Sequence, residues 1–167
     1  MRKLLPIFII LIISFNVYTQ EYQQSIGARG GFTSGITYKK FLNEMKAMEA
    51  IMSFRINGIQ LTALRQYHEL TLYKHSDNYY FIHGYGGHLG FIYAHKDEFL
   101  LFNRVIKENG RGFAPVVGLD AYLGIEYRMD QFPFTIGFDY KPFIEFSLLP
   151  FKMNLWDFSF SIKYTFN

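Results

Sequence analysis

The end of the chain, Trp156-Asp157-Phe158-Ser159-Phe160-Ser161-Ile162-Lys163-Tyr164-Thr165-Phe166, alternates large apolar with small or charged side chains without a break. Successive side chains of a β-strand point to opposite faces, so a period of two predicts a strand with one apolar and one polar face. The run exceeds the usual globular strand of about five or six residues. It matches the roughly nine to eleven residues of a tilted transmembrane strand.

The same alternation recurs along the chain and predicts eight strands in total. The other segments are 25–32, 36–39, 48–56, 59–68, 79–93, 117–128 and 134–145. Asn57-Gly58 is typical of a two-residue hairpin turn. Residues 24–42 fit either one long strand or two strands joined by a tight turn. The resulting pattern favours an all-β, antiparallel up-and-down barrel.

The connections fit this meander. Short polar turns at 42–46, 73–78 and 129–132 would all lie at one end, the periplasmic end if both termini are periplasmic. The longest connection, 95–113, would then lie outside the cell, as is usual in such barrels, and is a candidate surface for an external partner. Phe99, Phe102 and Ile106 have helical spacing, so a short helix is an alternative to a loop there.

Composition limits the class of protein. The chain has 167 residues, half of them hydrophobic and a fifth aromatic, and it has no cysteine. This length suits one domain. The composition excludes a disordered chain, a coiled coil and a disulfide scaffold. The 17 basic and 14 acidic residues form no concentrated basic face, so nucleic acid is not an expected partner.

Residues 1–19 have the pattern of a cleaved signal peptide, leaving residues 20–167 as one domain. Arg2 and Lys3 precede an apolar stretch that ends at Phe15, and small residues follow before Gln20. About twelve apolar residues are too few to span a bilayer comfortably. An uncleaved anchor is the alternative interpretation.

Three features predict that the apolar face points outward, towards lipid. Glycines recur on the polar face, where a narrow barrel needs small residues. Six cations and six anions balance there, and a closed lumen cannot leave charges unpaired. The predicted lumen ion-pair network comprises Arg29, Lys39, Glu49, Arg55, Asp120, Glu126, Arg128, Asp139, Lys141, Glu145, Asp157 and Lys163. Aromatic residues near strand ends predict a lipid-facing girdle at the two interfaces: Tyr79, Tyr93, Tyr127, Phe134, Trp156, Tyr164 and Phe166.

Two residues interrupt the apolar face. Arg65 is expected near a membrane interface or at a change of register. His83 either faces lipid or is turned inward by a bulge. His88 falls on the polar face and is expected in the lumen network.

The chain resembles the small OmpA/OmpX-type outer-membrane barrels of Gram-negative bacteria, especially the outer membrane protein beta-barrel domain proteins of Bacteroidota. The residues that carry the resemblance are Gly118-Leu119-Asp120, Leu123 to Tyr127, Asp139 to Pro142 and Ile162 to Phe166. The resemblance implies a location in the outer membrane and recognition of the C-terminal strand by the barrel-assembly machinery. Asn167 follows the terminal aromatic Phe166, which departs from the family pattern.

These observations predict a non-enzymatic membrane barrel with a structural or surface-interaction role and no open pore. A lipid A-modifying enzyme and a soluble lipocalin-like ligand binder are the alternatives. His75-Ser76-Asp77 has the residue types of a catalytic triad, but adjacent residues in one turn rarely converge, so a polar turn is the preferred interpretation. His83 and His88 fall on opposite faces, so no metal site or cofactor is expected.

Overall fold

The computed structural model describes residues 23–55, 58–70, 78–94, 112–147 and 152–167. The predicted signal peptide, the alternative helix around Phe99 and the His75-Ser76-Asp77 turn lie outside these residues. Within them, no helix is long and apolar enough to cross a membrane.

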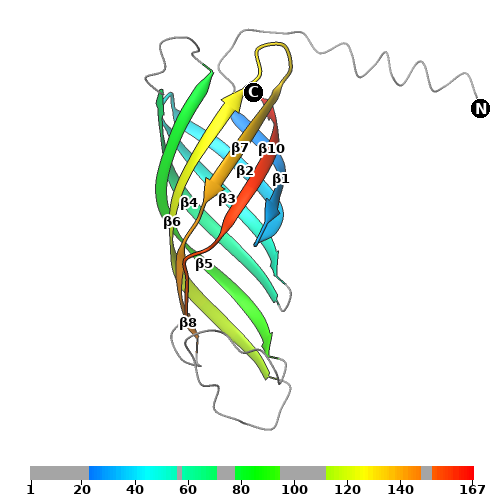
Figure 1. Cartoon of the computed structure of the whole chain (residues 1–167), viewed down its shortest axis with the longest axis vertical. Helices are drawn as coiled ribbons and strands as arrows, with labels where there is room; N and C mark the ends of the chain where they lie inside the picture. The colour runs from blue at the N-terminus through cyan, green and yellow to red at the C-terminus, as the bar shows by residue number, and fades with distance from the viewer. Residues whose placement is uncertain (1–22, 56–57, 71–77, 95–111, 148–151) are drawn as a thin grey trace, which may run out of the picture.

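The described chain is an antiparallel barrel built from ten β-segments (Figure 1). The segments are β1 (Gln24–Gly31), β2 (Ser34–Asn43), β3 (Lys46–Arg55), β4 (Gly58–Leu70), β5 (Tyr79–Ala94), β6 (Gly112–Arg128), β7 (Phe134–Tyr140), β8 (Phe143–Ser147), β9 (Lys152–Asn154) and β10 (Phe158–Phe166). The sheet runs from β5 through β4, β3, β2, β1, β10 and β7 to β6, and pairing of β5 with β6 closes it. Closure leaves no long exposed edge.

The ten segments form eight barrel strands, as the sequence predicts. β7 and β8 are two parts of one interrupted strand, and β9 and β10 are two parts of another. β7 and β8 pair with β6 in one continuous register, and the Ala121 amide donates to the Pro142 carbonyl between them. Pro142 has no amide hydrogen and ends the ladder there. The interrupted strand formed by β9 and β10 pairs with β7 and β8. Met153 and Phe158 on this strand are five residues apart, whereas their pairing partners Ile144 and Tyr140 are only four residues apart. This extra residue is a β-bulge.

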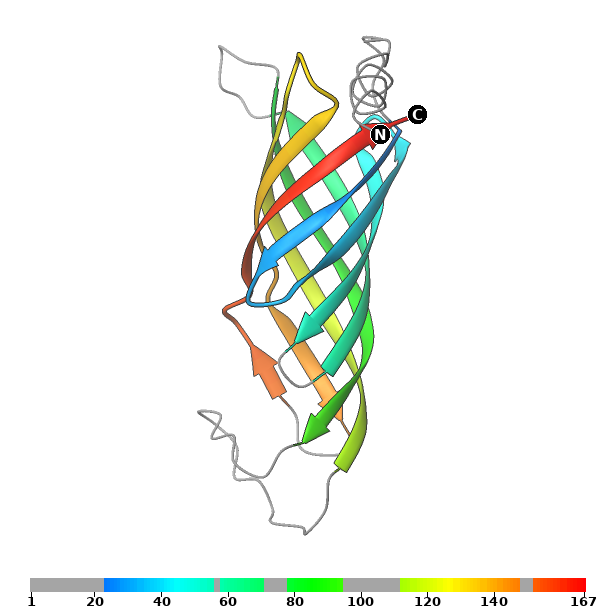
Figure 2. The same cartoon turned by 90° about the vertical axis from the view of Figure 1, so that its right-hand side faces the viewer.

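Other strand boundaries refine the predictions. Residues 24–42 form two strands, β1 and β2, rather than one. β6 begins at Gly112, five residues before the predicted start at 117, and the last strand begins at Phe158 instead of Trp156. β5 and β6, with 16 and 17 residues, extend well beyond the β1–β2 hairpin, so one rim of the barrel is uneven (Figure 2).

The side chains alternate as an inside-out barrel requires. The outer face carries exposed apolar residues on every long strand, among them Ile36, Leu61 and Phe160, whereas buried positions are mainly polar or charged. Glycines allow the tight interior: a Cβ at Gly86 would collide with the Ala63 carbonyl oxygen of the paired strand. The soluble lipocalin-like alternative is therefore wrong, since it requires the opposite facing.

Candidate functional site

One part of the lumen holds a balanced cluster of two lysines and two glutamates. Lys39 Nζ lies 2.8 Å from Glu126 Oε2, and Lys163 Nζ lies 3.2 Å from the same oxygen. Lys163 Nζ also lies 3.0 Å from Glu49 Oε1. Thr37 and Gln66 donate hydrogen bonds to Glu49. This four-residue cluster joins β2, β3, β6 and β10, so strands distant around the barrel are linked through its centre.

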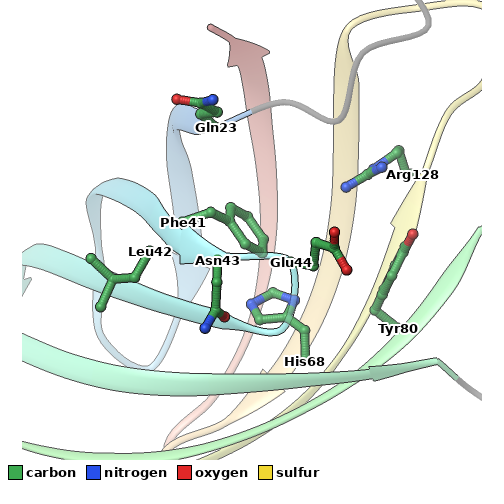
Figure 3. A pocket seen from close by; sticks show the side chains of 8 residues that line it. All are labelled: Gln23, Phe41, Leu42, Asn43, Glu44, His68, Tyr80 and Arg128. Atoms are coloured by element: carbon green, nitrogen blue, oxygen red, sulfur yellow. The ribbon is translucent and has the colours of Figure 1, made fainter.

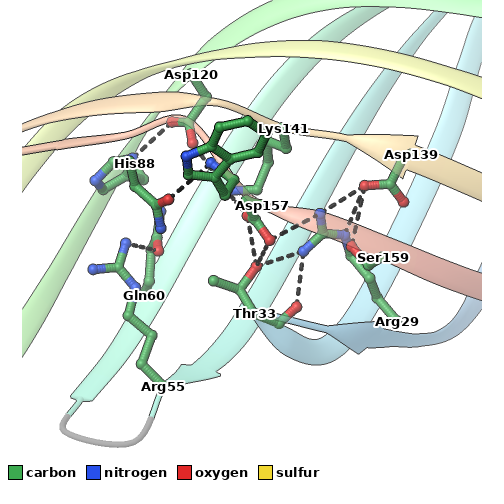
Figure 4. A network of polar contacts seen from close by, with 12 residues as sticks. Arg29, Thr33, Arg55, Gln60, His88, Asp120, Asp139, Lys141, Asp157 and Ser159 are labelled. Atoms are coloured by element: carbon green, nitrogen blue, oxygen red, sulfur yellow. Dashed lines mark hydrogen bonds and ion pairs between the residues drawn. The ribbon is translucent and has the colours of Figure 1, made fainter.

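A second, larger network begins at Arg29 on β1 (Figure 4). Arg29 Nη2 lies 2.6 Å from Asp139 Oδ1 and 3.6 Å from Asp157 Oδ1. The Thr33 hydroxyl lies 2.8 Å from Asp157 Oδ2. Lys141 Nζ contacts Asp157 Oδ2 at 3.2 Å. All of these side chains are buried.

The network continues from Lys141 towards the long strands. Lys141 Nζ lies 3.1 Å from Asp120 Oδ1. His88 sits between two carboxylates, with Nδ1 2.7 Å from Asp120 Oδ2 and Nε2 3.4 Å from Glu145 Oε2. Arg55 Nη1 contacts Glu145 Oε2 at 2.7 Å. These polar contacts therefore form a continuous chain across the lumen from Arg29 to Arg55, and the buried ring of Phe143 lies against both Lys141 and Arg55.

The ion pairs described above include Arg29, Lys39, Glu49, Arg55, Asp120, Glu126, Asp139, Lys141, Glu145, Asp157 and Lys163 of the predicted lumen network. Arg128, also predicted for this network, is half-buried at the end of β6, with its guanidinium carbon 5.1 Å from the centroid of the Tyr80 ring. His88 joins the network, as expected from its place on the polar face.

Sequence reasoning missed an apolar contribution to the lumen. Ile51, Leu64, Ile82 and Tyr122 form a buried cluster on strands β3 to β6. The alternation assigned the three aliphatic residues, Ile51, Leu64 and Ile82, to neither face of their strands. Their positions could have indicated this. Each lies an even number of residues from a buried polar residue on its own strand, and such positions share one face.

A pocket with a cavity volume of about 330 Å³ opens at the end of the barrel that carries the C-terminus (Figure 3). Phe41, Glu44, His68, Tyr80 and Arg128 are among its lining residues. The His68 side chain is buried, and none of the described residues forms a hydrogen bond with its Nε2. No predicted catalytic or ligand-binding residue falls here.

The predicted aromatic girdle divides into two groups. Tyr79 packs on Tyr127 with ring centroids 4.8 Å apart, and Phe134 packs on Tyr164 at 5.5 Å. Tyr164 also stacks with Phe166. These five residues lie near the end that carries the termini.

The second aromatic group lies where β9 gives way to β10. Trp156, which is 68% exposed, contacts Phe158. Phe158 stacks on Tyr140 at 4.7 Å, and Phe138 contacts Phe160 at 4.9 Å. Of this group only Trp156 was predicted. The side chain of Tyr93 lies outside the described part of the molecule.

The two interrupting residues both face outward. The pairing of β4 and β5 shows no register shift, so no bulge turns His83 inward. His83 stacks on Tyr67 with ring centroids 5.3 Å apart, and its Nδ1 lies 3.7 Å from Glu69 Oε1. Arg65 is exposed, with its guanidinium carbon 5.8 Å from the centroid of the Tyr67 ring.

A closed, eight-stranded antiparallel barrel with an apolar outer wall and a charged lumen is the architecture of small OmpA-type outer-membrane barrels. In agreement, the chain is similar to the crystal structure of the N-terminal β-barrel domain of Pseudomonas aeruginosa OprF, with a TM-score of 0.58 and 12% sequence identity. The match covers 88% of this chain and 100% of the other. At this identity the likeness establishes the fold. No protein-family model matches the sequence, and no curated protein matches it significantly.

Proposed function

We propose that this protein is an integral outer-membrane barrel with a structural or surface-interaction role and a lumen closed by its own side chains. The observation that carries the proposal is the reversed facing: Lys39, Lys141 and Asp157 are 0% exposed, whereas Phe160 is 67% exposed. An exposed apolar wall of this extent is unfavourable in water and favourable in hydrocarbon.

The filled lumen supports the absence of an open pore. Eight strands enclose an interior only wide enough for side chains. Here two charged clusters and the aliphatic residues beside Tyr122 occupy it. In planar bilayers the purified barrel should give no conductance of porin size. A stable open state of that size would contradict the plug.

The shortest of the described histidine–carboxylate contacts also supports a non-enzymatic role, because it lies inside the barrel. His88 and Asp120, which form a close pair, have side chains that are 0% exposed inside the barrel, away from any lipid substrate. If the protein modified lipid A, mass spectrometry of lipid A would differ between cells with and without it. We expect identical spectra.

The gel migration of boiled and unboiled membrane extract tests the membrane assignment directly. A folded barrel in the outer-membrane fraction should change its mobility on boiling. Recovery in the soluble periplasmic fraction would refute the proposal.

Two partners belong to this proposal. The barrel-assembly machinery would recognise the C-terminal strand, so removal of Phe166 and Asn167 should reduce the amount inserted in cells. Residues 95–113 would offer a surface to an extracellular partner. Because β6 begins at Gly112, replacement of residues 95–111 alone by a short Gly-Ser linker should leave the gel shift intact.

A further inference from the structure

On the described strands, the charged residues of the outer wall are confined to one side of the barrel. Among described side chains of the strands, those of Lys, Arg, Asp, Glu or His that point outward are found on β2 to β5 alone. We call them the outer charged patch: Lys40, Lys46, Arg65, Glu69 and His83. The described outward positions of β1, β6, β7 and β10 carry apolar, aromatic, glycine and proline residues and one uncharged polar residue, Gln24.

Strand pairing gathers the patch into one surface. Lys40 pairs with Met48, which pairs with Arg65 on the next strand. Lys46 pairs with Tyr67, which pairs with His83. The three cations therefore lie on three consecutive strands, and neighbouring strands are about 4.8 Å apart.

The patch lies towards the end of the barrel that carries the termini. Lys46 is the first residue of β3, Lys40 lies three residues before the end of β2, and Glu69 is the last but one of β4. Arg65 leans over the Tyr67 ring, which is nearer to that end. Long cationic side chains on a lipid-facing wall reach towards the headgroups in this way.

Charge selects the partner. The outer charged patch contains three Lys or Arg residues and one acidic residue, Glu69. Glu69 lies beside His83. A zwitterionic headgroup has no net charge to neutralise the excess positive charge of the patch. The headgroup of an anionic phospholipid carries a net negative charge and can neutralise it. We propose that the outer charged patch binds the phosphate headgroup of an anionic phospholipid in the leaflet at the terminal end of the barrel. The inference rests on the membrane function proposed above.

Native mass spectrometry of the full-length mature protein, released from vesicles of equimolar phosphatidylglycerol and phosphatidylethanolamine, tests this site. The wild-type barrel should retain phosphatidylglycerol preferentially. The triple variant Lys40→Gln, Lys46→Gln, Arg65→Gln should lose that preference, by about fivefold for each cation removed. As a charge-matched control, Arg104→Gln, Lys107→Gln, Arg111→Gln removes three cations from the β5–β6 connection and should keep the preference.

The outcomes are distinguishable. If the wild-type protein shows the gel shift but retains both lipids equally, the lipid site is overturned and the membrane function is not. Persistence of the preference in the first variant also overturns it. A wild-type dimer that this variant dissociates, without a phosphatidylglycerol adduct, would assign the patch to a second copy of the chain. A wild-type protein without any gel shift overturns the membrane function and the site together.

Discussion

Arg29 and Asp139 lie 110 residues apart in sequence and form an ion pair of 2.6 Å inside the barrel, with side chains that are only 2% and 3% exposed. Arg29 Nε also donates to the same carboxylate oxygen at 3.1 Å. The pair joins β1 to β7, which are separated by β10 in the sheet. It therefore stabilises contacts across the lumen that backbone pairing does not provide.

Replacing one member of this pair should be far worse than replacing both. Arg29→Met leaves Asp139 without its cation, and a buried charge deprived of its partner costs about 3–5 kcal/mol. The double variant Arg29→Met, Asp139→Leu should recover part of that loss. Urea unfolding of the barrel refolded in lipid vesicles measures both. Additive losses in the double variant would show that the pair is not coupled.

A carboxylate should be tolerated inside the barrel and not outside. Ser25 is buried and pairs with Lys39, whereas Ala28 on the same strand is exposed on the outer wall. Ser25→Asp gains a neighbouring cation. Ala28→Asp places a charge against lipid, at a cost below the roughly 2–4 kcal/mol of a Lys or Arg at the bilayer centre. The heat-modifiable fraction in vesicles compares them, and equal harm would contradict the facing.

Two glycines of β1 should differ in their tolerance of a methyl group. A Cβ at Gly27 would meet the Ile162 carbonyl oxygen and would lie 2.6 Å from Lys163 Cα, whereas at Gly30 nothing lies within 4 Å. Gly27→Ala should therefore destabilise the barrel by about 1–3 kcal/mol, the usual cost of overpacking. Gly30→Ala serves as the control and should unfold at nearly the wild-type urea concentration.

The two buried histidines should respond in opposite ways to replacement by Phe. Within the described part of the chain, the buried His68 Nε2 meets no hydrogen-bonding group, and the His68 and Phe41 ring centroids are 4.7 Å apart. Since an unsatisfied buried polar atom costs about 1–3 kcal/mol, His68→Phe should be neutral or stabilising. His88→Phe removes the contact with Asp120 and should destabilise. The urea midpoints of the two variants test this contrast, and a larger loss for His68→Phe would refute it.

Much of the fold was predictable because alternation is a local property. A period of two assigns each side chain to a face without knowledge of the neighbouring strand. The structure confirmed the eight strands, the closed barrel and the outward-facing apolar side chains that this period predicts. The break at Pro142 was missed, since alternation continues through it: Lys141 and Phe143 are both buried on the same side.

The pairing within the lumen was not predictable. Balanced charges indicated that partners exist, but not that Lys163 would contact both Glu49 and Glu126. Those choices depend on the register of every strand, which accumulates around a closed sheet. A shift of one residue in a single strand would send its charges to lipid and its apolar residues inward.

The sequence by itself determined the strands, the reversed facing and the identity of the charges inside, because all three follow from alternation along one strand. Only the tertiary structure decided which charges meet, where the pocket beside His68 opens, and that Lys40, Lys46 and Arg65 share one side of the wall. The physical reason is that these relationships are set between strands: hydrogen-bond register and barrel closure bring together residues that no local pattern relates.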